Sequence, residues 1–166
     1  IAGLSLANNG QSNTFTVTIT GTTGKLTVGN HNFGAGDVGI ATVRPSASGA
    51  PNTEVSNLVF DCNVDAQSLV MHSGGNVIVN AGKIVEIDNI NNIGGGDPAT
   101  TITVAGTLNS TSIQLSAVTT RNLIIETGGA VNTTTLTGSN NSVTNNGSIS
   151  ISDPGNSDIS TLNSEG

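Results

Sequence analysis

The chain has 166 residues, of which 9% are charged and 2% aromatic, and eleven acidic residues against four basic ones give a net charge of −7. This balance argues against nucleic acids and anionic membrane surfaces as partners, because both are bound by clustered Lys or Arg. No apolar run reaches the roughly 18 residues of a transmembrane helix, so we expect no membrane insertion. Val, Ile and Leu alternate with Thr and Ser, which is typical of half-buried strands and argues against disorder.

Short strands separated by small corners are predicted along the first 50 residues. Residues 1–6 fit a first short strand, and 14–20 is the cleanest alternating segment, with its three apolar residues facing a core and its four threonines facing outward. A Gly-Thr-Thr-Gly corner separates it from a strand at 25–28, and the pair fits either a hairpin or two sides of one coil. Another strand is expected at 39–43.

Residues 44–53 contain two prolines and no strand signal, which predicts a surface loop. We take this loop as the boundary between an N-terminal β section (1–50) and a regular solenoid (51–166) within one continuous domain. Residues 89–99, with a triple glycine and Asp97-Pro98, predict a second loop. Further strands are expected at 56–62, 68–72, 76–79, 85–87, 101–104, 112–116, 122–125, 148–152 and 158–162.

A recurring unit lies in the stretch from 101 to 152, where an apolar pair is followed by a small polar corner, a glycine and another apolar residue. If Gly82, Gly106, Gly129 and Gly147 are equivalent, the successive spacings are 24, 23 and 18 residues. These spacings match one coil of a β-helix. The sequence therefore predicts an all-β parallel β-helix, or β-solenoid, of irregular coils, whose first 50 residues are either coils or a partly antiparallel unit.

Asparagine recurs at the predicted corners, at Asn80, Asn132, Asn145 and Asn146. Its side chain tolerates a left-handed backbone and can bond to a neighbouring coil. We expect stacked asparagines to stiffen the solenoid, a structural role that we favour over ligand binding.

Residues suited to catalysis are scarce. The two histidines, His31 and His72, lie in no nucleophile or metal motif, and the single Cys62 is expected to be a buried thiol. A polysaccharide-active site needs clustered carboxylates and usually aromatic platforms, but the chain has no Trp or Tyr. We therefore expect no enzyme activity and no cofactor.

The enzyme alternative depends on one arrangement of charged residues. It would be favoured only if the fold gathered Asp61, Asp65, Glu86 or Asp88 with Arg121 in one groove.

Four acidic residues near corners are weak candidates for calcium ligands. Asp61 and Asp65 flank three residues, and Asp153 and Asp158 bracket a Pro-Gly corner. Neither pair matches a known calcium-binding loop, so solvated turn carboxylates are the favoured interpretation. Four glycosylation sequons begin at Asn109, Asn132, Asn140 and Asn146.

Threonine rows suggest a further alternative, an ice-binding face. Such a face requires Thr-x-Thr at one position of successive equal coils, and the uneven spacing argues against this. Exposed strand faces favour β-branched threonine in any case. The residues concerned are Thr14, Thr16, Thr18, Thr20, Thr133, Thr135 and Thr137.

Two runs carry a family resemblance: residues 106–115, Gly-Thr-Leu-Asn-Ser-Thr-Ser-Ile-Gln-Leu, and residues 128–136, Gly-Gly-Ala-Val-Asn-Thr-Thr-Thr-Leu. They resemble passenger repeats of bacterial autotransporter and haemagglutinin-type adhesins, including rickettsial surface antigens. The resemblance covers about residues 74–152 and implies a right-handed parallel β-helix displayed outside the cell.

From the sparse charge and the lack of catalytic groups, we expect an extracellular or cell-surface structural subunit. It would associate with copies of itself, end to end or laterally, into a filament or surface layer. The alternatives are a segment of an adhesin passenger that binds a cell-surface partner, and a polysaccharide-active or ice-binding β-helix.

Overall fold

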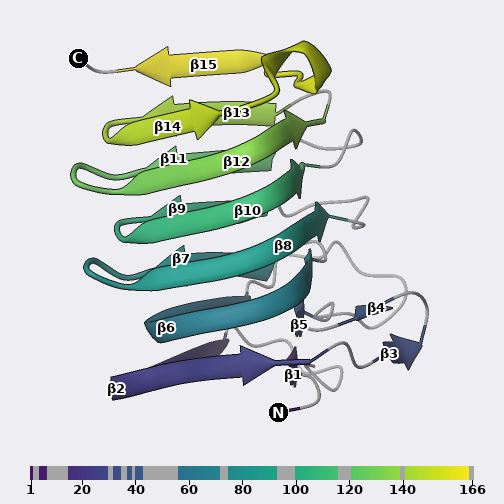
Figure 1. Cartoon of the computed structure of the whole chain (residues 1–166), viewed down its shortest axis with the longest axis vertical. Coiled ribbons are helices and arrows are strands. Elements are labelled where there is room, and N and C mark those ends of the chain that lie inside the picture. Colours follow the sequence, from purple (N-terminus) through teal and green to yellow (C-terminus); the bar gives the residue numbers. More distant parts are fainter. Residues whose placement is uncertain are drawn as a thin grey trace.

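The chain folds into a stack of parallel strands wound around one axis (Figure 1). The computed structural model describes residues 1, 4–6, 15–29, 32–34, 37–38, 40–42, 56–71, 75–92, 100–115, 121–138 and 141–164. Its strands are β1 (Leu4–Leu6), β2 (Phe15–Val28), β3 (Asn32–Gly34), β4 (Asp37–Val38), β5 (Ile40–Thr42), β6 (Ser56–Met71), β7 (Gly75–Val79), β8 (Ile84–Asn92), β9 (Thr101–Val104), β10 (Thr107–Gln114), β11 (Arg121–Ile125), β12 (Ala130–Thr137), β13 (Asn141–Asn145), β14 (Ser148–Ile151) and β15 (Thr161–Ser164). A 3₁₀ turn, η1 (Pro154–Asn156), precedes β15.

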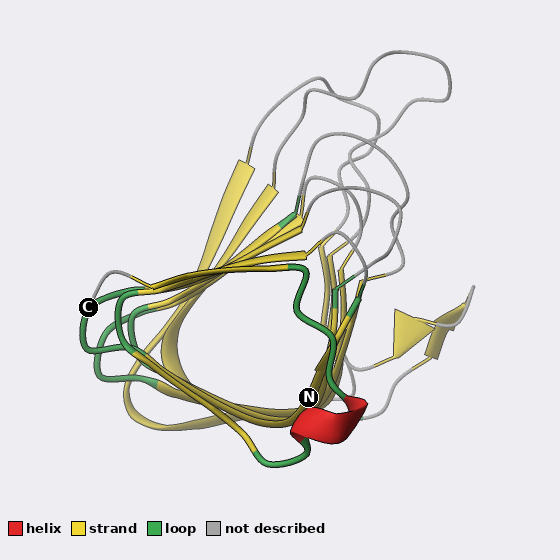
Figure 2. Ribbon diagram, turned by 90° about the horizontal axis from the view of Figure 1, so that it is seen from above, coloured by secondary structure: helices red, strands yellow, loops and turns green. Residues whose placement is uncertain are grey.

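Each coil has three sides, which enclose the core when the molecule is viewed along its axis (Figure 2). Face A holds β7, β9, β11, β13 and β15 together with the first parts of β2 and β6. Face B holds β14, the first parts of β8, β10 and β12, the middle of β6 and the last part of β2. Face C holds β1, β5 and the last parts of β6, β8, β10 and β12.

The solenoid is right-handed. In Figure 1 the near strands β8, β10 and β12 run toward the right, and the chain returns behind them and climbs toward the C-terminus with each coil. The expected right-handed parallel β-helix is therefore confirmed.

The N-terminal section contributes both coils and a small antiparallel unit. Both parts of β2 pair in parallel with β6, with a register shift between Thr20 and Lys25. Residues 14–28 are therefore two sides of one coil and not a hairpin, as far as they are described. Among the described strands only β3 and β4 pair antiparallel, and they lie to the side of the solenoid (Figure 2).

The core consists of aliphatic columns that run along the axis. On face A the register aligns Leu58, Val77, Ile102, Leu123 and Val143, and each is at most 2% exposed. Burial of one such side chain contributes about 1.5–3 kcal/mol, so stability accumulates coil by coil.

Several strands are longer than the sequence predicts. β6 continues through residues 63–67, and β8 continues through 89–92, part of the loop predicted at 89–99. That part of the loop prediction is wrong, because Ile90 is 1% exposed and residues 89–92 pair in parallel with the last part of β6. The backbone turns the corner from face B to face C without leaving the sheet. The loop predicted at 44–53 lies outside the described residues.

The tight corner between faces A and B explains the glycine repeat, with one correction. Thr107 N–H donates to Lys83 O, Ala130 N–H to Gly106 O and Ser148 N–H to Gly129 O. Lys83, and not Gly82, is therefore the equivalent of Gly106. Gly82 corresponds instead to Gly128, and both adopt a left-handed backbone, with φ of 73° and 84°.

The last described coil is less buried than those before it. β15 begins at Thr161, later than the strand predicted at 158–162, because Asp158 N–H donates to Leu136 O and Ser160 N–H to the side chain of Asn141. Leu162 continues the column above Val143 but is 55% exposed, since no described strand follows β15.

Candidate functional surfaces

Two aligned rows on the outward side of face A contain no charged residue, and we call these rows the uncharged face; Asp61, which aligns with Thr20 at the corner with face B, lies just beyond them. The two rows come from seven described strand segments. The first row is Thr16, Asn57, Asn76, Thr101, Asn122, Ser142 and Thr161, and the second row is Thr18, Val59, Ile78, Thr103, Ile124, Thr144 and Asn163.

Side-chain hydrogen bonds hold part of the first row in register. Asn57 Nδ2 donates to Thr16 Oγ1 at 3.1 Å, and Asn76 Nδ2 donates to Asn57 Oδ1 at 3.1 Å. Asn76 Oδ1 in turn accepts from the Thr101 backbone N–H at 3.0 Å. These bonds link four successive coils, so this row is a preorganised polar ladder.

The second row is more apolar. Val59, Ile78 and Ile124 point outward on face A and are only partly covered by their neighbours, alternating with threonines higher in the stack. Apolar side chains on an otherwise uncharged sheet suit packing against another flat surface.

Threonines proposed for an ice-binding face do not share one surface. Thr16, Thr18 and Thr20 are exposed on β2, whereas Thr133 is 5% exposed and donates through Oγ1 to Thr135 O at 2.9 Å. Thr14 lies outside the described residues. The uneven coil lengths do not prevent alignment, because the connections from β8 to β9, β10 to β11 and β12 to β13 take up eight, six and three residues.

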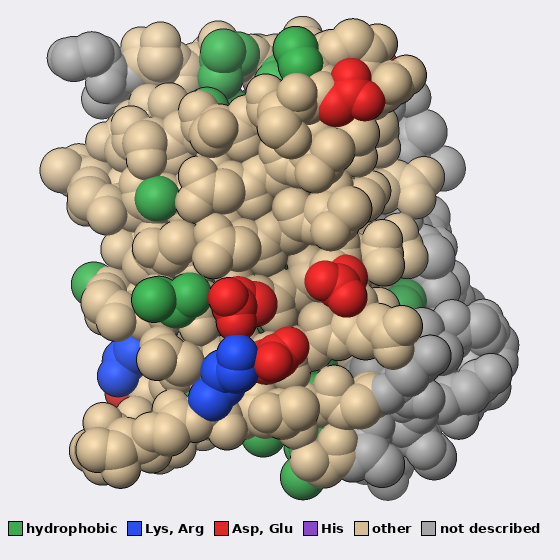
Figure 3. Space-filling model, viewed as in Figure 1, with side chains coloured by type: hydrophobic (Ala, Val, Ile, Leu, Met, Phe, Trp, Pro, Cys, Tyr) green, Lys and Arg blue, Asp and Glu red, His purple; other side chains and the backbone are tan. Residues whose placement is uncertain are grey.

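Charged residues concentrate on face B (Figure 3). Lys25 Nζ lies 3.0 Å from Asp65 Oδ2 and 2.8 Å from Glu86 Oε2, and so joins three successive coils. Hydrogen bonds to Glu86 and then Asp65 raise the pKa of Lys25 above its ordinary value. All three side chains are about half exposed, so the pair energies are small and screened by salt.

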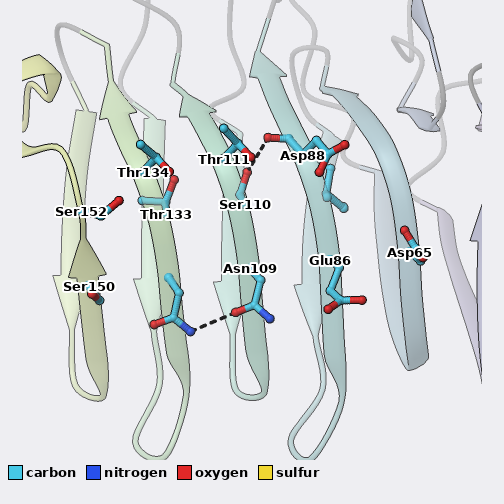
Figure 4. A pocket seen from close by; sticks show the side chains of 12 residues that line it. Asp65, Glu86, Asp88, Asn109, Ser110, Thr111, Thr133, Thr134, Ser150 and Ser152 are labelled. Carbon is cyan, nitrogen blue, oxygen red and sulfur yellow. Dashed lines mark hydrogen bonds between the residues drawn. The ribbon is translucent and has the colours of Figure 1, made fainter.

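A shallow groove of about 540 Å³ follows the axis across face B (Figure 4). β6, β8, β10, β12 and β14 all contribute to it. Its lining residues are Asp65, Glu86, Ile87, Asp88, Asn109, Ser110, Thr111, Asn132, Thr133, Thr134, Ser150 and Ser152.

The groove has a floor and two walls because side chains alternate across the strands. Inward-facing residues such as Ile87 and Thr133 form the floor, at 2% and 5% exposure. One wall follows the register Asp65, Glu86, Asn109, Asn132 and Ser150. The other wall is Asp88, Thr111, Thr134 and Ser152.

Hydrogen bonds inside the groove fix its shape. Asn132 Nδ2 donates to Asn109 Oδ1 at 2.9 Å, which links β12 to β10 (Figure 4). Ser110 Oγ lies 3.0 Å from Ser112 O and 3.2 Å from Asp88 O, and its one O–H can donate to either of these carbonyls where the chain bends. Within the described part of the chain, the hydroxyls of Thr111, Thr134 and Ser152 make no hydrogen bond.

The groove gathers three of the acidic residues named for the enzyme alternative, but not the other charged residues. Asp65, Glu86 and Asp88 line it, whereas Asp61 lies elsewhere. Arg121 begins β11 on face A, and its side chain lies outside the described part of the structure. The arrangement on which the enzyme alternative depends is therefore not seen among the described residues.

The calcium candidates form two pairs in different parts of the chain, Asp61 with Asp65 in β6 and Asp153 with Asp158 around η1. Asp61 Oδ1 lies 3.6 Å from Lys83 Nζ and accepts a hydrogen bond from Asn80 Nδ2 at 3.2 Å. Asp65 instead meets Lys25, so different lysines partner the two carboxylates. The described residues contain no group of three or more His, Cys, Asp or Glu side chains suited to a metal ion.

Asp153 and Asp158 lie around η1, where they take part in hydrogen bonds. Asp153 Oδ2 accepts from Asn156 Nδ2 at 2.7 Å, and Asp153 O accepts from Ser157 Oγ at 2.9 Å. Asp158 O accepts from Asn141 Nδ2 at 2.8 Å. Asn156 thus engages the carboxylate of Asp153, whereas the bond at Asp158 uses its backbone carbonyl.

The asparagines predicted to stack at corners do so only in part. Asn132 lies within β12 and not at a corner, and there it donates to Asn109 of β10, whereas the corner residue Asn80 donates to Asp61 and not to another asparagine. Asn145 Oδ1 accepts from Gly147 N–H within its own corner, while Asn146 Oδ1 is buried without a partner among the described residues. Asn140 lies outside the described residues.

The remaining candidate residues are Cys62, His31 and His72. Cys62 is a buried free thiol, as expected, and burial raises its pKa. His31 and His72 lie outside the described residues. Among the described residues, no helix has the length and hydropathy needed to cross a lipid bilayer.

Comparison of the chain with protein-family models, with curated proteins and with solved structures finds no match. Functional inference therefore rests on the surfaces of the molecule itself. Neither the uncharged face nor the groove was predicted from the sequence. The sequence does carry one sign of the uncharged face, namely several strand segments without any charged residue: 15–20, 56–60, 75–79, 101–104 and 141–145.

Proposed function

We propose that the protein is an extracellular structural β-solenoid whose copies associate side by side through the uncharged face into a filament or surface layer. The observation that carries this proposal is the distribution of charge. Fourteen aligned outward residues on face A include no Asp, Glu, Lys or Arg, although the chain has a net charge of −7.

Electrostatics and packing both favour this face for contacts between identical chains. Two copies with a net charge of −7 repel each other, and the repulsion is strongest where acidic side chains come close. A face without charges avoids that cost. Outward Val59, Ile78 and Ile124 also gain from burial against a second sheet, which packs about 10 Å away.

The location outside the cell is part of the same proposal. Its support is the resemblance of residues 74–152 to adhesin passenger repeats, together with the polar, lysine-poor composition. Immunogold labelling of intact cells of the source organism tests it. The proposal predicts label on unpermeabilised cells, and label that is seen only after permeabilisation would contradict it.

The association is tested with matched charge substitutions on two faces. Thr103→Lys and Ile124→Lys place cations in the second row of the uncharged face, while Thr111→Lys and Thr134→Lys add the same charge on face B. Electron microscopy and sedimentation velocity compare the two double variants with the unmodified protein. All four positions point outward, so each variant is expected to fold.

Side-by-side association predicts filaments or sheets for the unmodified protein and for the face B variant, and their loss in the face A variant. Monomers of the unmodified protein at every accessible concentration would contradict the proposal. Equal loss of assembly in both variants would also contradict it, because the effect would then come from charge alone and not from the face.

A further inference from the structure

We propose that the groove on face B binds one extended, uncharged polysaccharide chain along the solenoid axis. This inference concerns a different surface from the uncharged face, so either proposal can fail without the other. The observations that carry it are the groove's shape, its repeat and its chemistry.

The groove repeats along its length as a polymer does. Five strands contribute to it, and neighbouring strands in a sheet lie about 4.8 Å apart. This repeat is close to the length of one sugar ring in an extended glycan. A ligand made of repeating units can therefore meet an equivalent pair of wall residues at each coil, such as Asn109 with Thr111 and Asn132 with Thr134.

The walls offer groups that both donate and accept hydrogen bonds. The hydroxyls of Thr111, Thr134 and Ser152 have no partner among the described residues, so a ligand can bond to them in place of water without breaking a hydrogen bond within that part of the protein. The amides of Asn109 and Asn132 are held by their mutual bond at 2.9 Å, which reduces the entropy lost on binding. Sugar hydroxyls are the natural complement, since they also donate and accept.

The charges of the groove restrict the ligand further. Lys25 already pairs with Asp65 and Glu86, and the carboxylate of Asp88 adds negative charge to the other wall. A polyanion, whether an acidic polysaccharide or a nucleic acid, is repelled there. An extended peptide is a poorer fit, because its residues repeat about every 3.2–3.4 Å and so do not match the spacing of about 4.8 Å between strands.

Binding is tested by isothermal titration calorimetry with cellohexaose and chitohexaose, two uncharged hexasaccharides, with cellobiose and polygalacturonate alongside. We expect saturable binding of at least one hexasaccharide and at least tenfold weaker binding of cellobiose, which reaches fewer coils. Polygalacturonate is expected not to bind.

The groove itself is tested with isosteric substitutions. Thr111→Val together with Thr134→Val removes two hydroxyls while keeping β-branched side chains, and we expect on the order of tenfold weaker hexasaccharide binding. Thr103→Val on the uncharged face is the matched control and should leave binding unchanged. Thermal melting of each variant confirms that it is folded.

Three results would overturn the inference: no binding of either hexasaccharide, tighter binding of polygalacturonate, or equal effects of the groove and control substitutions.

Discussion

At the scale of single residues, the corner between faces A and B permits only glycine at most of its stacked positions. A methyl group at Gly129 would overlap the carbonyl of Val104 in the preceding coil, and one at Gly147 would overlap the carbonyl of Gly129. Backbone atoms of a stacked sheet cannot move aside without breaking ladder bonds. The glycine repeat is therefore a packing requirement as well as a conformational one.

Gly129→Ala is predicted to lower the free energy of unfolding by roughly 2–4 kcal/mol, because the new methyl group forces two coils apart. Gly155→Ala is the control, since a Cβ there meets nothing closer than Asp153 Oδ1 at 3.7 Å. Its effect should stay within about 0.5 kcal/mol. Urea denaturation followed by circular dichroism measures both, and similar losses would contradict the stacking model of the corner.

The folded chain is expected to lose stability at alkaline pH, where Lys25 loses its proton and its ion pairs. The pKa of Lys25 is raised in the folded chain by Glu86 and Asp65, so its contribution is complete below the ordinary value of 10.5 and disappears as pH rises through the folded value. The melting temperature of Lys25→Met should therefore lie below that of the parent at neutral pH, and the difference should shrink as pH rises beyond 10.5 and vanish once the pH exceeds the folded pKa.

In the comparison of Lys25→Met with the parent, the ionisation of the Cys62 thiol has to be separated from that of Lys25. Burial raises the pKa of the thiol above 9.0, so the unfolded chain ionises first and stability falls with pH for this reason too. Both proteins should therefore carry Cys62→Ala. A melting difference that stays constant from pH 7 to beyond pH 10.5 would show that the Lys25 ion pairs contribute nothing.

At the scale of strands, alternation determines which substitutions matter. Ile102 lies 1% exposed in the face A column, while the adjacent Thr103 points outward. Ile102→Asp buries an unpaired carboxylate and is predicted to unfold the chain at room temperature, whereas Thr103→Ser should change stability by about 0.5 kcal/mol or less. Equal shifts in thermal melting would contradict the assignment of inward and outward positions.

Strand length was harder to predict than strand pattern. The alternation at 101–104 and 16–20 identifies inward and outward residues correctly, because each of these segments lies on one face. Continuity around the corner is not visible in the sequence. In β10, Ser110 uses its single hydroxyl hydrogen to bond a carbonyl at the bend, so a polar residue that looks like a loop signal in fact keeps the strand intact.

The burial of polar residues at the last described coil could not be predicted from the sequence either. Asn141 is 2% exposed, donates to Gly138 O and Asp158 O, and accepts from Ser160 N–H. It thereby attaches the segment after η1 to β13. In a chain this rich in asparagine, nothing distinguishes a buried asparagine from a corner asparagine until the register is known.

At the scale of the whole molecule, composition and repeat predict the β-solenoid, but they do not predict its surfaces. The uncharged face and the groove each depend on residues about 20 positions apart being in register, such as Asn109 with Asn132. An off-by-one assignment, as between Gly82 and Lys83, would turn inward residues outward. Pairing across coils had to be known before either surface could be seen.

The distribution of charge leads to a prediction about salt. If association uses the uncharged face, added salt screens the mutual repulsion of chains that each carry a charge of −7, without weakening the contact itself. Association through the Lys25, Asp65 and Glu86 pairs of face B would respond in the opposite way, because those ion pairs are exposed.

Sedimentation velocity of the unmodified protein, measured at one concentration from about 0.01 M to about 1 M sodium chloride, tests the central claim most directly. Association through the uncharged face predicts a weight-average sedimentation coefficient that exceeds the monomer value and rises with salt. A coefficient that stays at the monomer value throughout, or falls as salt is added, would contradict it.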